Sequence, residues 1–94
     1  MPQFDVAHLH EQGQELIIIP LDLSFGSRVE ADQSRIASEL QARASAAGLR
    51  GTVVPVWDAG NGRMAFIAPR RWHPFFANIG LDFVAANLNR ALSW

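Results

Sequence analysis

The sequence contains no cysteine. This absence excludes disulfide bonds, thiolate metal sites and catalysis by a cysteine nucleophile. Small secreted domains often depend on disulfides for their stability, so a cysteine-free chain of 94 residues favours a reducing cytoplasm. Lysine is also absent, and all eight basic residues are arginine, a composition that is typical of a GC-rich bacterial genome. We therefore expect a cytoplasmic bacterial protein.

Long hydrophobic runs and a strong net charge are missing as well. The longest apolar run, residues 16–21, is far shorter than the ~20 residues that a membrane-spanning helix needs. The N-terminal residues lack the basic start and the apolar stretch of a signal peptide. The formal net charge is −1 and the isoelectric point about 6.2, whereas general nucleic-acid binders are usually basic. We expect a soluble protein that does not contact membranes.

What is present suits one small domain. A length of 94 residues and a hydrophobic share of 49% are enough for a single core. We expect residues 14–94 to form one α/β domain. Residues 1–13 are polar with scattered apolar positions, and we expect an N-terminal arm there. This arm is either loose and flexible or packed on the body as a short extra strand or turn.

The first two elements have strong local signals. Residues 15–23 contain three consecutive isoleucines, which predict a strand that is covered on both faces. Residues 28–47 have apolar residues at steps of three and four, which predict a helix. Ser27 and Glu30 have the spacing of a capping box at its start. Gly48 has the position of a left-handed helix stop at its end.

A β-hairpin is predicted further along the chain. Two short apolar segments, residues 52–57 and 63–68, flank a glycine-rich turn at residues 58–62. Pro55 cannot donate a hydrogen bond to a neighbouring strand, which favours an edge position for the first of these strands. The second strand is then expected at the centre of the sheet.

Together these elements predict an α+β fold in β-α-β-β-α order. Residues 81–92 complete it as a terminal helix with apolar residues along one line. We expect a three-stranded, mainly antiparallel sheet in the order 1-3-2, with two helices on one face. A parallel pairing of the strand at residues 15–23 with the strand at residues 52–57 is the alternative.

Arginines and aromatic residues are concentrated after the hairpin. Guanidinium groups bind carboxylates and phosphates through paired N–H donors, and an exposed indole can stack on a base, a sugar or a protein side chain. We therefore predict a partner-binding surface. Its candidate residues are Trp57, Arg63, Arg70, Arg71, Trp72 and His73. The alternative is that Trp72, Phe75 and Phe76 belong to the core and that the arginines form only a solvated rim.

Other motifs indicate structure rather than chemistry. The alternate histidines His8 and His10, with His73 as a third ligand, suit a metal site, but nothing in the pattern preorganises them. We predict exposed polar residues at His8 and His10, and neither a metal nor a cofactor. The glycines of residues 60–62 predict a hairpin turn, because phosphate-binding loops open helices. No combination of serine, histidine and acid has a spacing that indicates a catalytic site.

The sequence favours a small domain without catalytic activity that binds another protein through the arginine and aromatic surface, because interface centres favour arginine and tryptophan. The first alternative is a module for single-stranded nucleic acid that uses the same residues, which the net charge disfavours. A small-ligand-binding protein or an enzyme is the second alternative, and either needs a concave pocket lined by several polar groups. The oligomeric state is left open.

Overall fold

The structure, a computed structural model, describes residues 3–60 and 62–93. Within these residues the fold is α+β. In chain order the elements are β1 (Gln3–Glu11), β2 (Gln14–Pro20), the 3₁₀ turn η1 (Leu23–Ser27), α1 (Glu30–Ala46), β3 (Thr52–Gly60), β4 (Arg63–Phe66), the 3₁₀ turn η2 (Arg70–Trp72), α2 (His73–Ala77), α3 (Leu81–Ala86) and β5 (Arg90–Ser93). No helix in this part of the chain is both long and apolar enough to cross a membrane.

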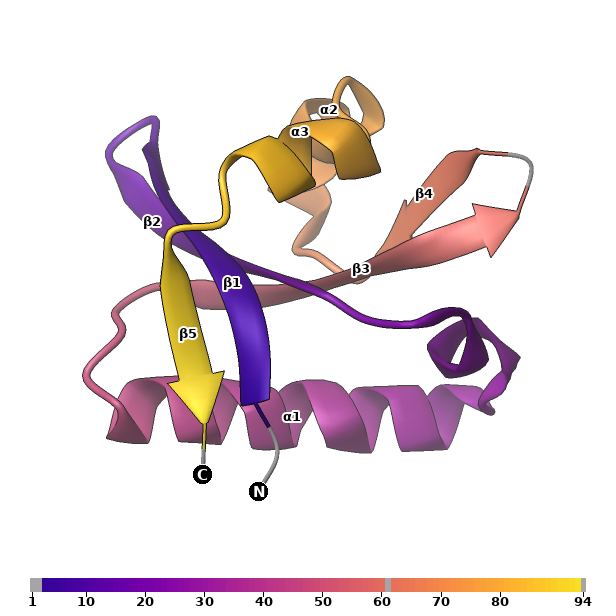
Figure 1. The fold of residues 1–94 in the computed structure, drawn as a ribbon, viewed down its shortest axis with the longest axis horizontal. Coiled ribbons are helices and arrows are strands. Elements are labelled where there is room, and N and C mark those ends of the chain that lie inside the picture. Colours follow the sequence, from indigo (N-terminus) through magenta and orange to yellow (C-terminus); the bar gives the residue numbers. More distant parts are fainter. Residues whose placement is uncertain (1–2, 61, 94) are drawn as a thin grey trace.

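The strands form one five-stranded mixed sheet in the order β4-β3-β2-β1-β5 (Figure 1). β2 and β3 are parallel neighbours, with Leu16 opposite Thr52 and Pro20 opposite Val56. The remaining pairings are antiparallel. The predicted three-stranded antiparallel sheet in the order 1-3-2 is therefore wrong. The structure contains the alternative, a parallel pairing, because α1 carries the chain back along the sheet before β3 begins.

Helices cover both faces of this sheet (Figure 1), with α1 along one face and α2 and α3 over the other. The alternation of side chains along the strands therefore produces two apolar clusters. The α2/α3-side cluster contains Ala7, Leu16, Ile18, Val54, Val56, Trp72, Phe76 and Val84. The α1-side cluster contains Val6, Ile17, Ile19, Leu40, Ala44, Val53 and Leu92. The prediction of two helices on one face is wrong.

The position of β2 explains its consecutive apolar residues. Leu16 and Ile18 belong to the α2/α3-side cluster, Ile17 and Ile19 belong to the α1-side cluster, and all four are fully buried. A strand with alternating polar residues would place a polar group in one of these clusters. The prediction of a strand covered on both faces is confirmed.

Pro55 lies inside the sheet rather than on its edge, because β3 pairs with β2 on one side and with β4 on the other. The Val56 carbonyl accepts a hydrogen bond from the Leu21 N–H on the β2 side, and the Pro55 carbonyl accepts one from the Ile67 N–H on the β4 side. Ile67 lies just beyond the last residue of β4. The one hydrogen bond that Pro55 cannot donate would therefore fall past the end of β4, where its loss matters little.

The start of α1 differs from the prediction, and its end agrees with it. The N-cap is Val29, which has no side-chain hydrogen bond, and Ser27 belongs to η1. The predicted capping box is wrong, because the 3₁₀ turn places Ser27 outside the first turn of α1. At the other end, Gly48 has a φ of 84°. The Leu49 N–H donates to the Ala44 carbonyl at 3.0 Å, which is the hydrogen bond of a Schellman motif.

The N-terminal segment is a strand within the sheet. β1 pairs with β2 on one side and with β5 on the other. Of the two alternatives for residues 1–13, the structure therefore contains the packed strand, while residues 1 and 2 lie outside the described residues. The turn from β1 to β2 consists of Gln12 and Gly13 at φ 52° and 76°, as a two-residue type I′ hairpin turn requires.

The predicted terminal helix over residues 81–92 is wrong in its second half. α3 is six residues long, and residues 90–93 form β5 beside β1. The apolar residues that were predicted to lie along one side of this helix have three different environments. Val84 joins the α2/α3-side cluster, Leu92 joins the α1-side cluster, and Leu88 is exposed. A short helix on one face of the sheet cannot contribute side chains to the clusters on both faces. The chain therefore leaves α3 after Ala86 and joins the edge of the sheet as β5.

The predicted hairpin is present. β3 and β4 are antiparallel neighbours, with Val56 opposite Phe66 and Gly60 opposite Arg63. Gly60 and Gly62 flank the turn at φ 100° and 74°, and residue 61 lies outside the described residues. The interpretation of these glycines as a hairpin turn is confirmed.

Candidate functional site

A crevice lies where the parallel strands β2 and β3 end. In a β-α-β unit both parallel strands end at the same edge of the sheet, and the loops at that edge commonly form binding sites. Here the loop after β2 contains η1, and β3 continues into the β3–β4 hairpin. The crevice between them has a volume of about 380 Å³. Its lining residues are Leu23, Gly26, Ser27, Trp57, Asp58, Ala59 and Gly60, and we call it the carboxyl-end crevice.

Close packing between η1 and Trp57 forms one wall of this crevice. The ring of Phe25 is buried and meets the Trp57 indole at a centroid distance of 4.7 Å and an angle of 61°. A Cβ at Gly26 would lie 2.8 Å from Trp57 Nε1. A glycine therefore follows Phe25 because a side chain there would push η1 away from β3. The Trp57 indole itself is only 8% exposed.

Leu23 in the crevice lining and Val29, close to the lining segment in the sequence, are large apolar residues with exposed side chains. Leu23, in its lining, is 63% exposed, and Val29, two residues after Ser27, is 67% exposed. Phe83 and Leu88, the other exposed large apolar residues of the described chain, are each 37% exposed. Isolated apolar residues are ordinary on a protein surface, and Leu23 differs from the others in that it also lines this crevice.

One carboxylate, that of Asp58, lies among the described lining residues of the crevice. Asp58 is half-buried, and its Oδ1 accepts a hydrogen bond from the Gly60 N–H at 2.7 Å. In residues 3–60 and 62–93, no basic side chain forms an ion pair with Asp58. The first turn of α1 adds Glu30 and Asp32, which disfavour a bound anion at this helix start. Arg28 follows Ser27 and Arg63 lies opposite Gly60, so charges of both signs adjoin the lining segments. A cationic group is the match to Asp58 itself, which is the charged residue among the described lining residues.

The six predicted binding residues do not form one surface. Trp57 and Arg63 lie at the β3–β4 hairpin, near the end of β3. Arg71 lies in η2, where its guanidinium donates a hydrogen bond to Gln14 Oε1 at the start of β2. Because β2 and β3 are parallel, the start of β2 and the end of β3 are at opposite ends of the sheet. Arg70 is exposed beside Arg71, so the arginines divide between the two ends.

Trp72 is part of the core. It is 3% exposed and belongs to the α2/α3-side cluster. Its ring lies 5.8 Å from that of Phe75, which in turn lies 5.1 Å from that of Phe76. This arrangement corresponds to the alternative interpretation of the sequence, in which the aromatic residues belong to the core and the arginines form a solvated rim. His73 is exposed, and its Nε2 lies 2.9 Å from the Ala68 carbonyl, a contact that holds the loop after β4.

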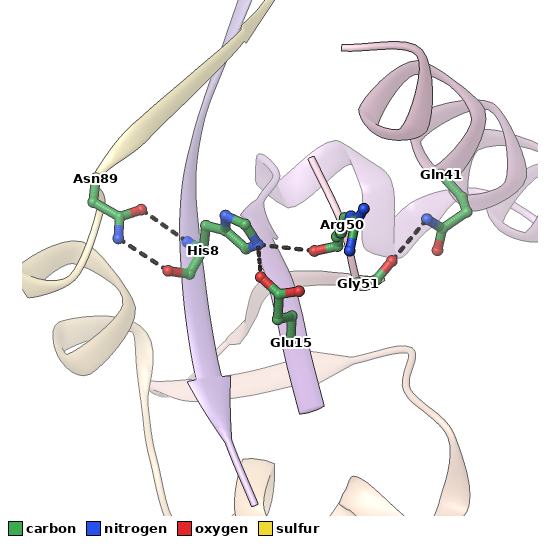
Figure 2. Close-up of polar contacts among 6 residues, drawn as sticks. All are labelled: His8, Glu15, Gln41, Arg50, Gly51 and Asn89. Atoms are coloured by element: carbon green, nitrogen blue, oxygen red, sulfur yellow. Dashed lines mark hydrogen bonds and ion pairs between the residues drawn. The ribbon is translucent and has the colours of Figure 1, made fainter. Parts of the chain in front are cut away.

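His8 lies in a polar cluster that joins several elements (Figure 2). Its Nε2 lies 2.8 Å from the Arg50 carbonyl and 3.3 Å from Glu15 Oε1. Both neighbours are acceptors, which assigns the proton of the neutral ring to Nε2. The Asn89 carboxamide accepts a hydrogen bond from the His8 N–H at 2.9 Å and donates one to the His8 carbonyl at 3.0 Å. The cluster therefore fastens β1 to β2, to the loop before β3 and to the segment before β5.

His8 is less accessible than predicted. Its side chain is 17% exposed, whereas His10 is exposed as predicted. Across the residues that the structure describes, no group of three or more histidine, aspartate or glutamate side chains could hold a metal ion. The contacts of His8 are those of a structural residue.

Comparison with known proteins returns no match to a family model, to a curated protein or to a solved structure. Reasoning from sequence missed Leu23 and Gly26, because no local pattern indicated that the segment after β2 packs against the end of β3. The signal that could have found them was the alternative prediction of parallel pairing between residues 15–23 and 52–57, because a β-α-β unit brings the loops after its two parallel strands together.

Proposed function

We propose that this protein is a small non-catalytic domain that binds a segment of another protein at the carboxyl-end crevice. The observation that carries the proposal is the exposure of Leu23 in the lining of a crevice whose carboxylate, Asp58, has no basic partner within the described residues. Val29, two residues after the lining residue Ser27, is also exposed. Removing apolar surface from water contributes about 25 cal/mol per Å² to association. A charged group at the same place adds specificity.

The chemistry of the crevice defines the partner segment as an apolar side chain next to a lysine or arginine. The apolar side chain contacts Leu23 and Val29 and enters the crevice, whose volume of about 380 Å³ suits a bound side chain. The basic group pairs with Asp58, which is half-buried and therefore less screened than a fully exposed carboxylate. An acidic segment would meet like charge at Asp58 and is disfavoured.

This proposal moves the contact surface away from most of the predicted residues. Of the predicted set, Trp57 is the member that lines the crevice. The nucleic-acid alternative loses its main support, because base stacking needs an exposed aromatic face. Trp57 and Trp72 are only 8% and 3% exposed.

The proposal includes no catalytic step. Acid–base catalysis needs a positioned donor or acceptor of protons that is matched to a reacting group. Among the described residues, the lining of the crevice contains one carboxylate, Asp58, one hydroxyl, Ser27, and no histidine. This set supports recognition of a charged and apolar segment rather than turnover of a substrate.

An array of short synthetic peptides tests the proposal. Each peptide carries one leucine, isoleucine or phenylalanine that is flanked by arginine and lysine, by glutamate or by serine. We expect the purified protein to retain the basic peptides preferentially. The double substitution Leu23→Ser with Val29→Ser is expected to weaken their binding about tenfold or more, which corresponds to ~1.4 kcal/mol.

Two further variants make the test specific. Asp58→Asn keeps an oxygen that can accept the Gly60 N–H, so it should fold normally and lose the preference for basic peptides. Leu88→Ser is the matched control, because it removes an exposed apolar side chain far from the crevice lining, and we expect unchanged binding. Two outcomes would contradict the proposal. One is preferential retention of acidic peptides, and the other is a Leu23→Ser, Val29→Ser double variant that binds basic peptides as tightly as the unsubstituted protein.

A further inference from the structure

β4 is the outermost strand at one side of the sheet (Figure 1). Its inner side pairs with β3, and just past its end the Ile67 N–H donates to the Pro55 carbonyl of β3. Successive residues of an antiparallel strand bond alternately to the neighbour on one side and on the other. The N–H and C=O groups of Met64 and Phe66 therefore point away from β3. Among the described residues no strand pairs with this outer side, which we call the β4 edge.

The side chain of His73 marks one end of the β4 edge. Its Nε2 lies 2.9 Å from the carbonyl oxygen of Ala68, two residues beyond Phe66, and its ring centroid lies 5.4 Å from that of Phe66. A side chain thus satisfies a backbone carbonyl where no strand does. The open part of the edge consists of the backbone groups of Met64 and Phe66.

The β4 edge carries no charge of its own. Residues 64–68 are Met, Ala, Phe, Ile and Ala. Native proteins commonly protect an open edge with charged side chains, with proline or with a covering segment. Here a charge and a proline are found only at the two limits of the apolar run, at Arg63 and Pro69. An open edge without such protection is a template for a further strand.

A cavity of about 400 Å³ adjoins β4 on its α2 side. The lining comes from the β3–β4 hairpin, from α2 and from the loop before α3, and none of the described lining residues belongs to β3. The cavity therefore lies toward the outer side of β4 rather than over the centre of the sheet. Its volume suits apolar side chains of an added strand. The lining residues are Gly62, Arg63, Met64, Phe66, Phe76, Ala77, Ile79 and Gly80.

Arg63 is the charged residue among these described lining residues. It is exposed, and within the described residues no carboxylate forms an ion pair with it. The nearest acidic residues in the sequence are Asp58, on β3, and Asp82, in the first turn of α3, and neither lines the cavity. Because opposite charges on facing strand residues attract, an acidic residue opposite Arg63 is the complement of this edge.

We propose that the β4 edge binds an extended segment of another protein as a further antiparallel strand. The segment alternates apolar and polar residues and carries an acidic residue that pairs with Arg63. The residues opposite Met64 and Phe66 form the backbone hydrogen bonds, and their side chains lie on the same face as Met64 and Phe66 and enter the cavity. The linings of this cavity and of the carboxyl-end crevice share no described residue, so this site stands or falls independently of the proposed function.

Amide hydrogen exchange tests whether the edge is open. In the free protein we expect fast exchange of the Met64 and Phe66 amides and slow exchange of the Ala65 and Ile67 amides, which face β3. Slow exchange at Met64 and Phe66 at every protein concentration overturns the proposal, because the edge is then covered within the chain. Protection that appears only as the protein concentration rises assigns the edge to a second copy of the chain and overturns the proposed partner.

The binding probe is the acetylated and amidated peptide Thr-Val-Thr-Val-Glu-Thr. When its second valine lies opposite Met64, its first valine lies opposite Phe66 and its glutamate lies opposite Arg63. We expect it to slow exchange of the Met64 and Phe66 amides in a saturable way. N-methylation of both valines should abolish this effect, because their N–H groups point at β4. N-methylation of the central threonine and the glutamate should preserve it, because their N–H groups point to solvent. Equal loss of binding from both patterns overturns the proposal.

Charge variants test the role of Arg63. Arg63→Glu is expected to weaken binding of the glutamate peptide about fivefold or more and to favour the same peptide with lysine in place of glutamate. Arg90→Glu is the matched control, because it makes the same change on β5, the edge strand at the other side of the sheet, and it should bind normally. Unchanged binding in Arg63→Glu, or equal affinity of the unsubstituted protein for the glutamate and lysine peptides, overturns the proposal.

The double variant Leu23→Ser with Val29→Ser separates this site from the carboxyl-end crevice. It should bind the glutamate peptide normally, since neither residue lines the cavity beside β4. The array peptides carry one apolar residue each and lack the two apolar positions that the β4 edge requires. Loss of glutamate-peptide binding in the double variant would assign that binding to the crevice and overturn the β4 site.

Discussion

At the scale of single residues, Gly51 shows how closely the chain approaches itself where β3 begins. Its φ is 128°, and a Cβ at this position would lie 2.5 Å from the carbonyl oxygen of Glu15. Both the conformation and the close approach require a glycine. Glu15 lies at the start of β2, so this glycine permits the two parallel strands to begin side by side.

We predict that Gly51→Ala lowers the free energy of unfolding by about 3 kcal/mol or more. The strained φ contributes ~1–3 kcal/mol, and the added methyl group meets a backbone atom that cannot move without displacing β2. Urea denaturation measures the change. Gly13→Ala is the matched control, because it also has a positive φ, 76°, but open space around the added methyl group. Equal losses for the two variants would show that the contact with Glu15 is unimportant.

At the scale of elements, β5 is short and depends on a side chain for its attachment. The strand has four residues, and the preceding Asn89 bonds to both backbone groups of His8 (Figure 2). The Asn89 N–H also donates to the Val6 carbonyl at 3.0 Å. The carboxamide thus provides the donor and the acceptor of one additional strand residue, and it extends the pairing between β5 and β1.

We predict that Asn89→Ala destabilises the protein by about 1–2 kcal/mol, because two hydrogen bonds to the backbone are lost together. Amide hydrogen exchange should accelerate first in β5. Asn78→Ala is the control, since the Asn78 side chain makes one hydrogen bond, to the Pro74 carbonyl at the exposed end of α2. Exchange in β5 that is no faster in Asn89→Ala than in Asn78→Ala would contradict this role.

At the scale of the whole molecule, one sheet lies between α1 on one face and α2 and α3 on the other (Figure 1). It separates two apolar clusters that share its central strands. β2 and β3 contribute alternate residues to each cluster, so neither cluster can open without exposing the other face of the same strands. Trp57 follows the alternation of β3 onto the α1 side, whereas Trp72 lies in the α2/α3-side cluster. The two indoles therefore report on opposite layers of one cooperative unit.

We predict that unfolding is a single transition in which both layers open together. Leu40→Ala on the α1 side and Phe76→Ala on the α2/α3 side should each destabilise the protein by about 2–5 kcal/mol. Each change should shift the fluorescence transitions of Trp57 and Trp72 equally, measured in proteins that retain one tryptophan with phenylalanine at the other positions. If Leu40→Ala shifts the unfolding transition reported by Trp57 and leaves that reported by Trp72 unchanged, the two layers unfold separately.

The candidate sites were only partly predictable from the sequence. Of the predicted residues, Trp57 lines the carboxyl-end crevice, Trp72 is buried in the α2/α3-side cluster, and Arg71 lies at the opposite end of the sheet, where it bonds to Gln14. Their grouping into one surface was not predictable, because it depends on which strand ends meet. The exposure of Leu23 and Val29 was missed for a related reason, since an apolar residue in a sequence is expected to be buried until the packing is known.

The sequence by itself determined the features that depend on a few neighbouring residues. These are the doubly buried strand β2, the helix α1 with its glycine stop at Gly48, and the β3–β4 hairpin. Only the tertiary structure decided the strand order, the inclusion of β1 and β5 as strands of the sheet, and the division of the helices between its two faces. The physical reason is that strand pairing and burial join residues far apart in the chain, and local propensity is silent about which distant partner a segment will meet.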